Sequence, residues 1–304
     1  MILLKVSDIL NDLRKHEELV LRDTMSLGDS IKLTLKILMT LQKFVKDEPI
    51  YIMFSGGKDS LVLLDLCIRV LPREQLKVVY IEVKDNTHEE NVGYVYSTVR
   101  HYYEISRENF VHLCNTKLGF YEAVAKWGWP GPRRKWCMNV FKRLVLMKYF
   151  KSKHNDKPLV LVGTKILDSK RRLKRFSRNG IVTDKFWWNI AVSPIAHFTD
   201  QHVHEYITRY NLPMCKLYQE LGESGNCVYC PFVMRREYYL QLYRLYPHWI
   251  YKIIATELKV RKGSPFIISP KRIGFKDILG EDLYNKILCE IEHNSSHVLC
   301  RRSS

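Results

Sequence analysis

The sequence predicts an α/β protein in which helices cover both faces of a doubly wound, mostly parallel sheet, with an N-terminal helical extension and a C-terminal helical region. From residue 49 onward, short apolar and β-branched runs alternate with helical patterns. Glycine-containing turns follow two of the expected strands, at Ser55–Ser60 and Gly163–Lys165. Ligands of such sheets bind beyond the carboxyl ends of the strands, where the strand order reverses. We therefore expect a ligand site at these strand ends.

The expected elements follow this alternation along the chain. Residues 1–48 read as two helices that are separated by Gly28, because apolar residues recur at three- and four-residue intervals. The predicted strands are 50–54, 77–83, 110–113 and 158–162; the predicted helices are 60–70, 90–103, 144–153 and 199–210; an aromatic-rich amphipathic stretch covers 235–260 and a partly helical tail covers 264–300. We expect a helical extension over 1–48, an α/β domain over 49–190 and a cysteine-bearing helical region over 191–304.

The charge balance indicates a polyanionic partner. Lys and Arg number 49 against 32 Asp and Glu, which gives a net charge of +17 over 304 residues. Nucleic acid, a nucleotide or an acidic protein would each suit this excess, and a solvated basic surface is the alternative. The densest basic runs are Arg133–Lys135, Lys165–Arg178 and Lys259–Lys262.

The sequence shows neither a membrane segment nor a signal peptide. No apolar stretch approaches the roughly 20 residues of a membrane helix, and the acidic N-terminus lacks a cleavage-site pattern. Eight cysteines in a chain of this kind indicate reduced thiols or a metal site rather than disulfides. We expect a cytoplasmic protein without a membrane partner.

The turn Ser55-Gly-Gly-Lys-Asp-Ser60 has the composition of an anion site. Gly56 and Gly57 can adopt positive φ and carry no Cβ to block a ligand, so successive N–H groups can form a nest at a helix N-terminus. Lys58 adds a mobile cation, the flanking serines add hydroxyl donors, and Asp59 falls in the first helical turn. The alternative is a glycine-rich turn without a ligand.

The cysteines suggest a metal centre. Cys227 and Cys230 form a C-x2-C pair, a spacing that serves zinc, iron–sulfur clusters and redox thiols alike. Cys215 lies 12 residues before this pair, and Cys137 lies far upstream. The remaining cysteines are interpreted as core or structural at Cys67, Cys114 and Cys289, and as ambiguous at Cys300.

Over roughly residues 49 to 235 the chain resembles the PAPS reductase-like branch of the PP-loop ATP pyrophosphatase superfamily. The Ser55–Ser60 turn looks like the SGGxDS loop of that superfamily and lacks the spacing of a Walker A loop. Three further segments carry the resemblance: Lys135-Trp-Cys137 with Lys142 is similar to R-W-C-x4-K; Gly163 to Arg172 is similar to G-x-R-x-x-E-S-x-x-R; and Pro194 to Cys230 is similar to P-I-x-x-W-T-x-x-D-V-x-x-Y followed by C-x-L-Y and G-C-x-x-C-P.

The resemblance implies an adenine nucleotide α-hydrolase-like fold that binds ATP and Mg²⁺. It marks Lys58, Asp59 and Lys142 as catalytic candidates. It assigns nucleotide binding to Ser55, Gly56, Gly57, Lys58, Asp59, Ser60, Gly163, Lys165, Ser169 and Arg172. In members with four such cysteines it implies a [4Fe–4S] cluster on Cys137, Cys215, Cys227 and Cys230. A structural zinc in the same pocket, or a C-x2-C pair beside two unrelated cysteines, stays open.

The sequence departs from the family pattern at several positions. Lys165 replaces an Arg and therefore loses the bidentate fork, and Asp168 replaces a Glu. Phe198 replaces a Trp. Cys137 is single where assimilatory reductases carry a Cys-Cys pair, and Cys300 lies outside the E-C-G-x-H frame of their tail. These departures weaken a sulfonucleotide reductase interpretation.

Three functions remain as hypotheses. The first is an ATP-dependent sulfurtransferase that adenylates nucleic acid, similar to tRNA-thiolating and DNA-phosphorothioating enzymes, with a sulfur donor such as a cysteine desulfurase. Basic runs would hold phosphates, and Trp127, Trp129 and Trp187–Trp188 would stack bases or pack in the core. The second is an APS or PAPS reductase with Cys300 as its thiol. The third is a degenerate nucleotide-binding module. A homodimer, and the choice between tRNA and DNA, are left open.

Overall fold

The computed structural model describes residues 25–131, 134–183, 188–233, 235–260 and 274–300, with side chains up to residue 293 in the last range. Contacts divide the chain into two units. Unit 1 contains residues 1–82, 89–114 and 142–215, and unit 2 contains residues 83–88, 115–141 and 216–304. The domain boundaries at residues 48 and 190 describe the sequence order and stay a prediction.

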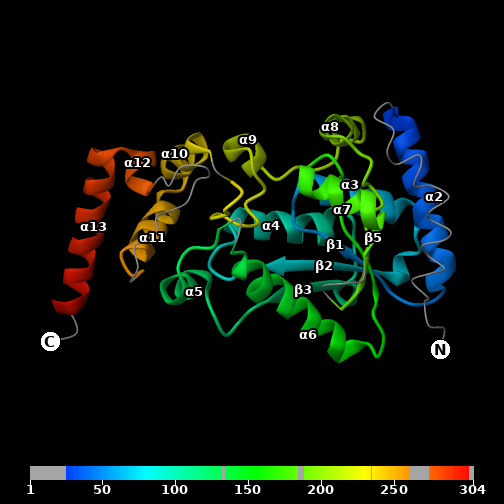
Figure 1. Cartoon of the computed structure of the whole chain (residues 1–304), viewed down its shortest axis with the longest axis horizontal. Coiled ribbons are helices and arrows are strands. Elements are labelled where there is room, and N and C mark those ends of the chain that lie inside the picture. The colour runs from blue at the N-terminus through cyan, green and yellow to red at the C-terminus, as the bar shows by residue number, and fades with distance from the viewer. Residues whose placement is uncertain (1–24, 132–133, 184–187, 234, 261–273, 301–304) are drawn as a thin grey trace. The chain divides into compact units, whose positions relative to one another are not determined.

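Unit 1 contains a six-stranded sheet in the order β3-β2-β1-β4-β6-β5 (Figure 1). The strands are β1 Ile50–Met53, β2 Leu76–Glu82, β3 Phe110–Cys114, β4 Leu159–Leu161, β5 Val182–Thr183 and β6 Ile190–Val192. All neighbouring pairs are parallel except β5 with β6. The strands β2 and β3 lie on one side of β1, and β4 lies on the other side. The strand order therefore reverses between β1 and β4. The predicted parallel sheet and its reversal are confirmed.

Helices cover both faces of this sheet, as the doubly wound prediction requires. The first face packs against α2 Leu27–Val45, α3 Lys58–Val70, α4 Glu89–Ser97 and α8 Asp200–Arg209. The second face packs against α6 Leu144–Lys153, which lies on the opposite side of the strands from α3 in Figure 1. Ile52 contributes to the first core and Tyr51 to the second, because successive strand residues point to opposite faces.

Helix boundaries differ from expectation in two places. The helix α2 begins at Leu27, because the side chain of Ser26 caps the N–H of Asp29; this helix therefore starts one residue before Gly28, the position predicted to separate two helices. The other predicted helix of residues 1–48 falls mostly outside the described residues. The stretch 235–260 forms two helices, α10 Arg236–Leu245 and α11 Pro247–Glu257, since Pro247 favours a helix start.

Two helices were not expected from the sequence. The basic run after Ser169 forms α7 Lys170–Asn179, and α5 Phe120–Trp127 lies between Gly119 and Gly128. Short helical turns complete the chain at η1 Arg73–Gln75, η2 Thr98–Tyr102, η3 Arg107–Asn109 and η4 Met138–Arg143. The η2 turn continues α4, so the predicted helix 90–103 is a shorter α-helix followed by a π-helical turn.

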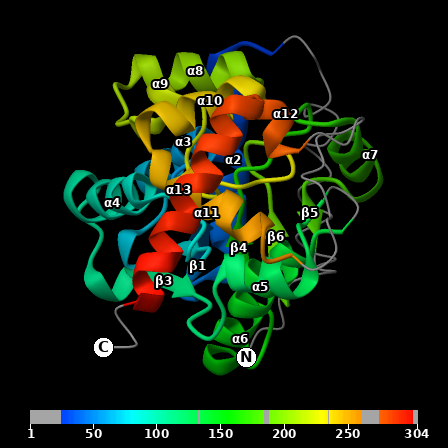
Figure 2. The same cartoon turned by 90° about the vertical axis from the view of Figure 1, so that its left-hand side faces the viewer.

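Unit 2 is helical. It contains α5, α9 Leu217–Leu221, α10, α11, α12 Phe275–Leu279 and α13 Glu281–Cys300. The helices α10 to α13 contact one another and lie together in Figure 2. Buried aromatic and aliphatic side chains such as Tyr238, Tyr239 and Ile253 form their interior. Among the described helices, none combines the length and apolarity needed to cross a membrane.

Candidate functional site

The turn after β1 has the backbone that the glycines predict. Gly56 adopts φ of 77°, a left-handed conformation that disfavours side chains. A Cβ at this position would also clash with the amide of Asn91 and contact Val95, both on α4. Gly57 is the N-cap of α3, and no described side chain caps this end of the helix. The positive end of the α3 dipole therefore faces the turn, as an anion site requires.

The turn is ordered by its own serines and by a neighbouring helix. The hydroxyl of Ser60 donates to the carbonyl of Gly57 at 2.8 Å and accepts from the N–H of Ser55 at 3.3 Å. The amide of Asn91 donates to the carbonyl of Ser55 at 3.2 Å, and Tyr80 in turn donates to Asn91 at 2.8 Å. The shape of the turn is thus fixed within unit 1.

The second glycine-containing turn touches the first. A Cβ on Gly163 would lie 3.0 Å from the carbonyl carbon and oxygen of Asp59 and from the nitrogen of Ser60. These are backbone atoms of α3, which cannot move aside easily. Only glycine allows the end of β4 to approach α3 this closely. The two predicted strand ends therefore meet at the point where the strand order reverses.

A network of charged side chains lies beside the two turns. The buried ammonium of Lys165, whose side chain is 2% exposed, donates to Asp59 at 2.6 Å and to Asp200 at 2.9 Å. It also lies 3.2 Å from Asp168, which pairs with Arg172. Lys58 reaches the same carboxylates: its ammonium lies 2.5 Å from Asp200 and 3.1 Å from Asp59. We call these six residues the charge network.

The ion pairs keep the charge network ionised. Burial lowers the pKa of Lys165, but hydrogen bonds to Asp59 and Asp200 outweigh that effect, and the net pKa is raised. Hydrogen bonds from Lys58 and Lys165 lower the pKa of Asp200 to about 2. Burial lowers the pKa of Arg172. Three acidic and three basic side chains thus nearly cancel before any ligand binds.

A strongly basic helix continues from the charge network. Ser169 caps α7 by accepting the N–H of Arg172 at 3.2 Å. The basic residues of α7 are Lys170, Arg171, Arg172, Lys174, Arg175 and Arg178. Phe176 is its buried anchor, and the guanidinium of Arg175 lies 4.5 Å from the centre of that ring. This helix places several cations close in sequence to the second glycine-containing turn.

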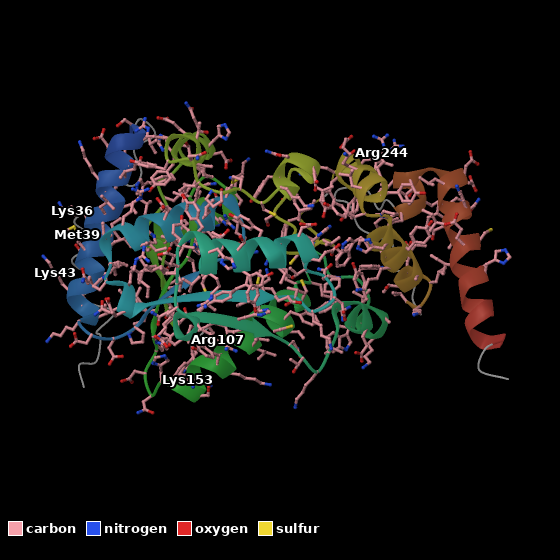
Figure 3. All side chains as sticks on the ribbon, turned by 180° about the vertical axis from the view of Figure 1, so that it is seen from behind. Lys36, Met39, Lys43, Arg107, Lys153 and Arg244 are labelled. Atoms are coloured by element: carbon pink, nitrogen blue, oxygen red, sulfur yellow. The ribbon has the colours of Figure 1, made fainter. Side chains whose placement is uncertain are left out.

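Further cations lie on the surface of unit 1. Lys36 and Lys43 project from α2 beside the exposed Met39, and Arg107 and Lys153 project from η3 and α6 (Figure 3). Scattered lysines of this kind are also typical of a solvated surface. The clustering on α7, rather than the total charge, distinguishes a candidate polymer surface.

The C-x2-C loop of unit 2 is held by a short segment from much earlier in the chain. The side chain of Asn86 donates to the carbonyl of Tyr229 and accepts its N–H, each at 2.9 Å. The carbonyl of Asn86 accepts the N–H of Val228 at 2.7 Å. Thr87 donates to the carbonyl of Asn226 at 3.0 Å. The loop between Cys227 and Cys230 is therefore built in detail rather than being a loose connection.

Three of the four candidate ligand cysteines gather in unit 2. Burial raises the pKa of Tyr229, and Cys230 and Cys137 raise it further. Burial likewise raises the pKa of Tyr238, with additional effects of Cys230 and Cys227. Cys137, Cys227 and Cys230 thus all belong to unit 2. Thiolates of this number suit an iron–sulfur cluster or zinc.

The full ligand set stays a prediction. Cys215 is buried and belongs to unit 1. In the part of the chain with described side chains, no group of three or more His, Cys, Asp or Glu residues is arranged to hold a metal ion. None of the seven described cysteines is in a disulfide.

The other predicted residues fall in different surroundings. Lys142 lies half-buried in η4, and its catalytic role stays a prediction. The ammonium of Lys135 lies 4.6 Å above the ring of Phe232, which follows the C-x2-C loop. Arg133 and Trp187 lie outside the described residues, as does the side chain of Cys300 at the end of α13. Trp129 is buried against Tyr229, whereas Trp127 is 41% exposed.

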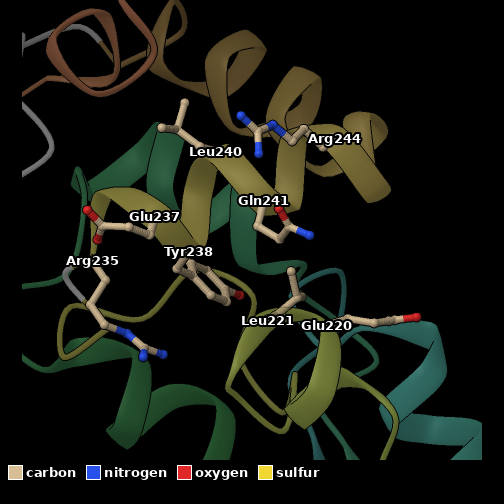
Figure 4. Close-up of a pocket in the computed structure, with 8 residues that line it drawn as sticks. All are labelled: Glu220, Leu221, Arg235, Glu237, Tyr238, Leu240, Gln241 and Arg244. Atoms are coloured by element: carbon tan, nitrogen blue, oxygen red, sulfur yellow. The ribbon is translucent and has the colours of Figure 1, made fainter.

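Unit 2 also contains a pocket of about 420 Å³ between α9 and α10 (Figure 4). Tyr238 lines it, and the hydroxyl of the same residue donates to the carbonyl of Val228 at 3.0 Å in the C-x2-C loop. Arg235 at its edge pairs with Glu223 at 2.7 Å. The pocket mixes acidic and basic side chains, so its charge favours no particular ligand.

Sequence reasoning missed three residues that organise these sites. The side chains of Asn91 and Asn86 form hydrogen bonds with the backbone of loops that are distant in sequence. No local sequence pattern reveals such contacts. Asp200 could have been found, because it directly follows Thr199, the N-cap of α8, and helix starts often face ligands.

Comparisons with known proteins identify a family for most of the chain. The family model described as the phosphoadenosine phosphosulfate reductase domain matches residues 49–239. An uncharacterized protein of Methanocaldococcus jannaschii is 31% identical over 198 residues. That alignment covers 63% of this chain but 38% of the relative, so the chain spans about two fifths of the length of that protein.

Three solved structures show a general likeness at low identity. A phosphoadenylyl-sulfate reductase from Candida auris, in a phosphate complex, is 16% identical over 64% of this chain and 92% of its own, with a TM-score of 0.45. An FMN adenylyltransferase from Candida glabrata with ATP is 17% identical over 71% and 68%, with a TM-score of 0.47. A U34-tRNA thiolase from Methanococcus maripaludis with its [4Fe–4S] cluster is 15% identical over 77% and 81%, with a TM-score of 0.44.

The family match spans the sheet, both glycine-containing turns, the charge network, α7 and the C-x2-C loop. It covers more than half of the chain. The chain therefore belongs to the phosphoadenosine phosphosulfate reductase domain family.

Proposed function

We propose that this protein is an ATP-dependent sulfurtransferase that adenylates a nucleic acid before sulfur is transferred to it. The observation that carries the proposal is the turn at the start of α3, where Gly56 has φ of 77° and Lys58 stands at the helix N-terminus. A helix N-terminus with glycines and a lysine binds polyphosphate well. The basic helix α7 follows the second turn of the same unit and supplies contacts for a polymer.

The residues of the Ser55–Ser60 turn, which we call the phosphate turn, would hold the leaving group. With the β- and γ-phosphates of ATP on Ser55–Ser60, an oxygen of the substrate attacks the α-phosphorus, and the bond to pyrophosphate breaks. The N–H groups of the turn and the ammonium of Lys58 stabilise the charge that develops on pyrophosphate. Mg²⁺ bound with ATP would neutralise part of the same charge. Lys165 supports this arrangement by keeping Asp59 in place at 2.6 Å.

The nucleic-acid substrate would contact α7. Arg171, Lys174 and Arg178 are exposed, while Arg172 turns toward the charge network and pairs with Asp168. Phosphate contacts of this kind orient a polymer without reading its sequence. The proposal covers tRNA and DNA equally, because the described residues favour neither.

The cysteines would hold the cofactor of sulfur transfer. Cys137, Cys215, Cys227 and Cys230 would bind a [4Fe–4S] cluster, with zinc as the alternative, and such a cluster can carry sulfur or electrons when it is bound. A donor protein such as a cysteine desulfurase would supply sulfane sulfur as a persulfide. A dithiol reductant would reduce this sulfur by two electrons to sulfide and become a disulfide, and the sulfide would displace AMP from the adenylated atom. Asn86 would keep the C-x2-C loop in the shape that positions two of these thiols.

A second candidate function is the reduction of a sulfonucleotide, which the matching family model favours by its description. A cysteine thiolate would attack the sulfur of APS or PAPS and release the nucleotide, leaving an S-sulfonate on the enzyme. A thiol donor would then release sulfite. Cys300 is the cysteine proposed for this step, and a few cations would suffice for one nucleotide.

One experiment separates the two candidates. The anaerobically purified protein is incubated either with ATP, Mg²⁺ and total tRNA or fragmented DNA, or with APS or PAPS and reduced thioredoxin. We expect pyrophosphate in the first mixture, stimulated by one nucleic acid, and no sulfite in the second. Sulfite without pyrophosphate would establish the reductase instead. Lys58→Ala should abolish the pyrophosphate signal, whereas Lys126→Ala, which removes an exposed partner of Glu122, should not.

A further inference from the structure

Asp200 occupies a singular place in the charge network. Its carboxylate oxygen Oδ1 accepts from Lys58 at 2.5 Å and from Lys165 at 2.9 Å. It is the first residue of α8, which Thr199 caps. The carboxylate thus contacts the very ammonium group that the phosphate turn would offer to a ligand.

Exposure decides which ion pair in the network can open. The side chain of Lys165 is 2% exposed and cannot leave its partners without a large desolvation cost. The side chains of Lys58 and Asp200 are 31% and 77% exposed. Both can rotate into water, and an exposed pair of this kind contributes only about 0–1 kcal/mol. The pair between Lys58 and Asp200 is therefore the one that a ligand can displace.

Charge balance makes that displacement necessary. The carboxylates Asp59, Asp168 and Asp200 offset the three cations of the network. A polyphosphate brings several negative charges to the same place and would be repelled by a carboxylate that remained on Lys58. The most exposed of the three carboxylates is also the one that holds Lys58 most closely.

We propose that Asp200 is a positioning residue that holds Lys58 in the absence of ligand and yields it when polyphosphate arrives. Asp200 thereby weakens the affinity of the turn for polyphosphate in the ground state and keeps the lysine oriented toward the turn. This proposal rests on the proposed function, since it takes the turn to be a polyphosphate site. It concerns Asp200 and the affinity for polyphosphate, whereas the proposed function is tested by Lys58→Ala and the release of pyrophosphate.

The proposal predicts tighter binding when the carboxylate is removed. Because the pair is worth about 0–1 kcal/mol and a repulsive charge is also lost, Asp200→Asn should bind polyphosphate about 3- to 10-fold more tightly. The rate at saturating ATP should not rise, because the freed lysine gains affinity in the ground state as much as in the transition state. The expected signature is a lower KM without a higher kcat.

The test measures the Kd of inorganic pyrophosphate by calorimetry on the full chain, with and without Mg²⁺. Glu205→Gln is the matched control, because it removes one carboxylate from the same helix, where Glu205 pairs with Arg209 at 2.6 Å. Asp200→Ser is a second variant, which removes the carboxylate without introducing the amide of Asp200→Asn. Thermal unfolding verifies that both variants fold. We expect tighter binding in both Asp200 variants without Mg²⁺, and unchanged binding in Glu205→Gln.

Three results would overturn the proposal. Equal or weaker binding in Asp200→Asn and Asp200→Ser would show that the carboxylate does not compete for Lys58. Equal tightening in Glu205→Gln would reveal a general effect of net charge. If the wild-type protein binds neither pyrophosphate nor ATP, the proposed function fails together with this inference; if it binds both and Asp200→Asn is unchanged, this inference alone fails.

A pH series tests whether the effect comes from a carboxylate that stays ionised throughout. The pKa of Asp200 lies at about 2, so the residue stays ionised from pH 5.5 to 8. The ratio of the two Kd values, wild type over Asp200→Asn, should therefore be constant across that range. A ratio that falls to one within this range would contradict the assignment to Asp200.

Discussion

The phosphate turn and the C-x2-C loop are both short loops with glycine beside them, but they are held in different ways. The phosphate turn owes its shape to Gly56, Gly57 and Ser60, which are adjacent in sequence. The C-x2-C loop depends on Asn86 and Thr87, which lie far upstream. A loop that is shaped by adjacent residues can be recognised from a sequence motif. For a loop that is held by distant residues, the sequence shows the candidate ligands but not the residues that hold the loop in place.

The strongest way to break the first loop is to add one methyl group at Gly56. Gly56→Ala places a Cβ against Asn91 and forces a side chain to adopt φ of 77°. We expect ATP binding to weaken by at least about 100-fold, because the N–H groups would no longer converge. Equilibrium dialysis with labelled ATP would measure this loss.

Gly93→Ala is the matched control for that substitution. A Cβ at Gly93 would meet nothing within 4 Å, and the residue lies inside α4. It should leave ATP binding unchanged and stabilise the fold by about 0.5–1 kcal/mol, since alanine is the better helix former. Equal losses in both variants would show that glycine geometry is not what shapes the turn.

The second loop should be most sensitive at Asn86. Asn86→Ala removes the two buried hydrogen bonds that the Asn86 side chain makes with the backbone of Tyr229, so we expect a loss of roughly 3 kcal/mol in the free energy of unfolding. Cys227 and Cys230 should also react faster with a thiol reagent, because their loop opens. Urea unfolding and labelling kinetics would measure the two effects. Asn115→Ala loses a bond of 3.4 Å to the carbonyl of Val140 and an exposed bond of 3.2 Å from the N–H of Lys117, and it should change stability by about 1 kcal/mol or less.

The acid stability of unit 1 should depend on His197. Burial lowers the pKa of His197 to about 4 from an ordinary value of 6.5. The unfolded chain therefore binds the proton first, and stability is full above pH 6.5 and falls as the pH drops toward 4. We expect a loss of about 2 kcal/mol between pH 7 and pH 5 that His197→Gln removes. Urea unfolding at a series of pH values would measure this loss, and the control His204→Gln, at an exposed position, should show the same dependence of the free energy of unfolding on pH as the wild type. If His197→Gln also keeps this dependence, another group is responsible.

The smallest effect is expected at the cap of α7. Ser169→Ala removes the acceptor for the N–H of Arg172, which should cost about 1 kcal/mol and increase hydrogen exchange in the first turn of α7. Ser177→Ala is the control, because its hydroxyl bonds only to carbonyls within the helix and caps no N–H in the described contacts. Exchange in α7 that is equal in both variants would contradict the capping role.

The sheet was predictable because its signals are local. The apolar run before Ser55 and the helical pattern after it specify β1 and α3, and α6 Leu144–Lys153 has the predicted limits. The helix α7 was missed because six of its ten residues are basic and Phe176 is its sole buried contact among those described, so no apolar stripe marks it. The helix α5 is short, and the two glycines that flank it read as loop.

The site was predictable in its residues but not in its connections. The pattern at Gly163 indicated a strand end, yet its contact with Asp59 appears only when β4 lies beside β1. Lys165 was expected to bind nucleotide, which stays a prediction; its contacts with three carboxylates of unit 1 could not be read from the sequence. Asp200 carries no motif, because its partners come from two other strand ends. Contacts between segments distant in sequence leave no periodic pattern to read.

The most direct test of the account is the identity of the phosphate product released from ATP. With γ-labelled ATP, Mg²⁺ and nucleic acid, the wild-type protein should release labelled pyrophosphate, and Lys58→Ala should release it at least about 100-fold more slowly. Release of orthophosphate with ADP, or an unchanged rate of pyrophosphate release in Lys58→Ala, would contradict the claim that this turn binds the departing phosphates of ATP.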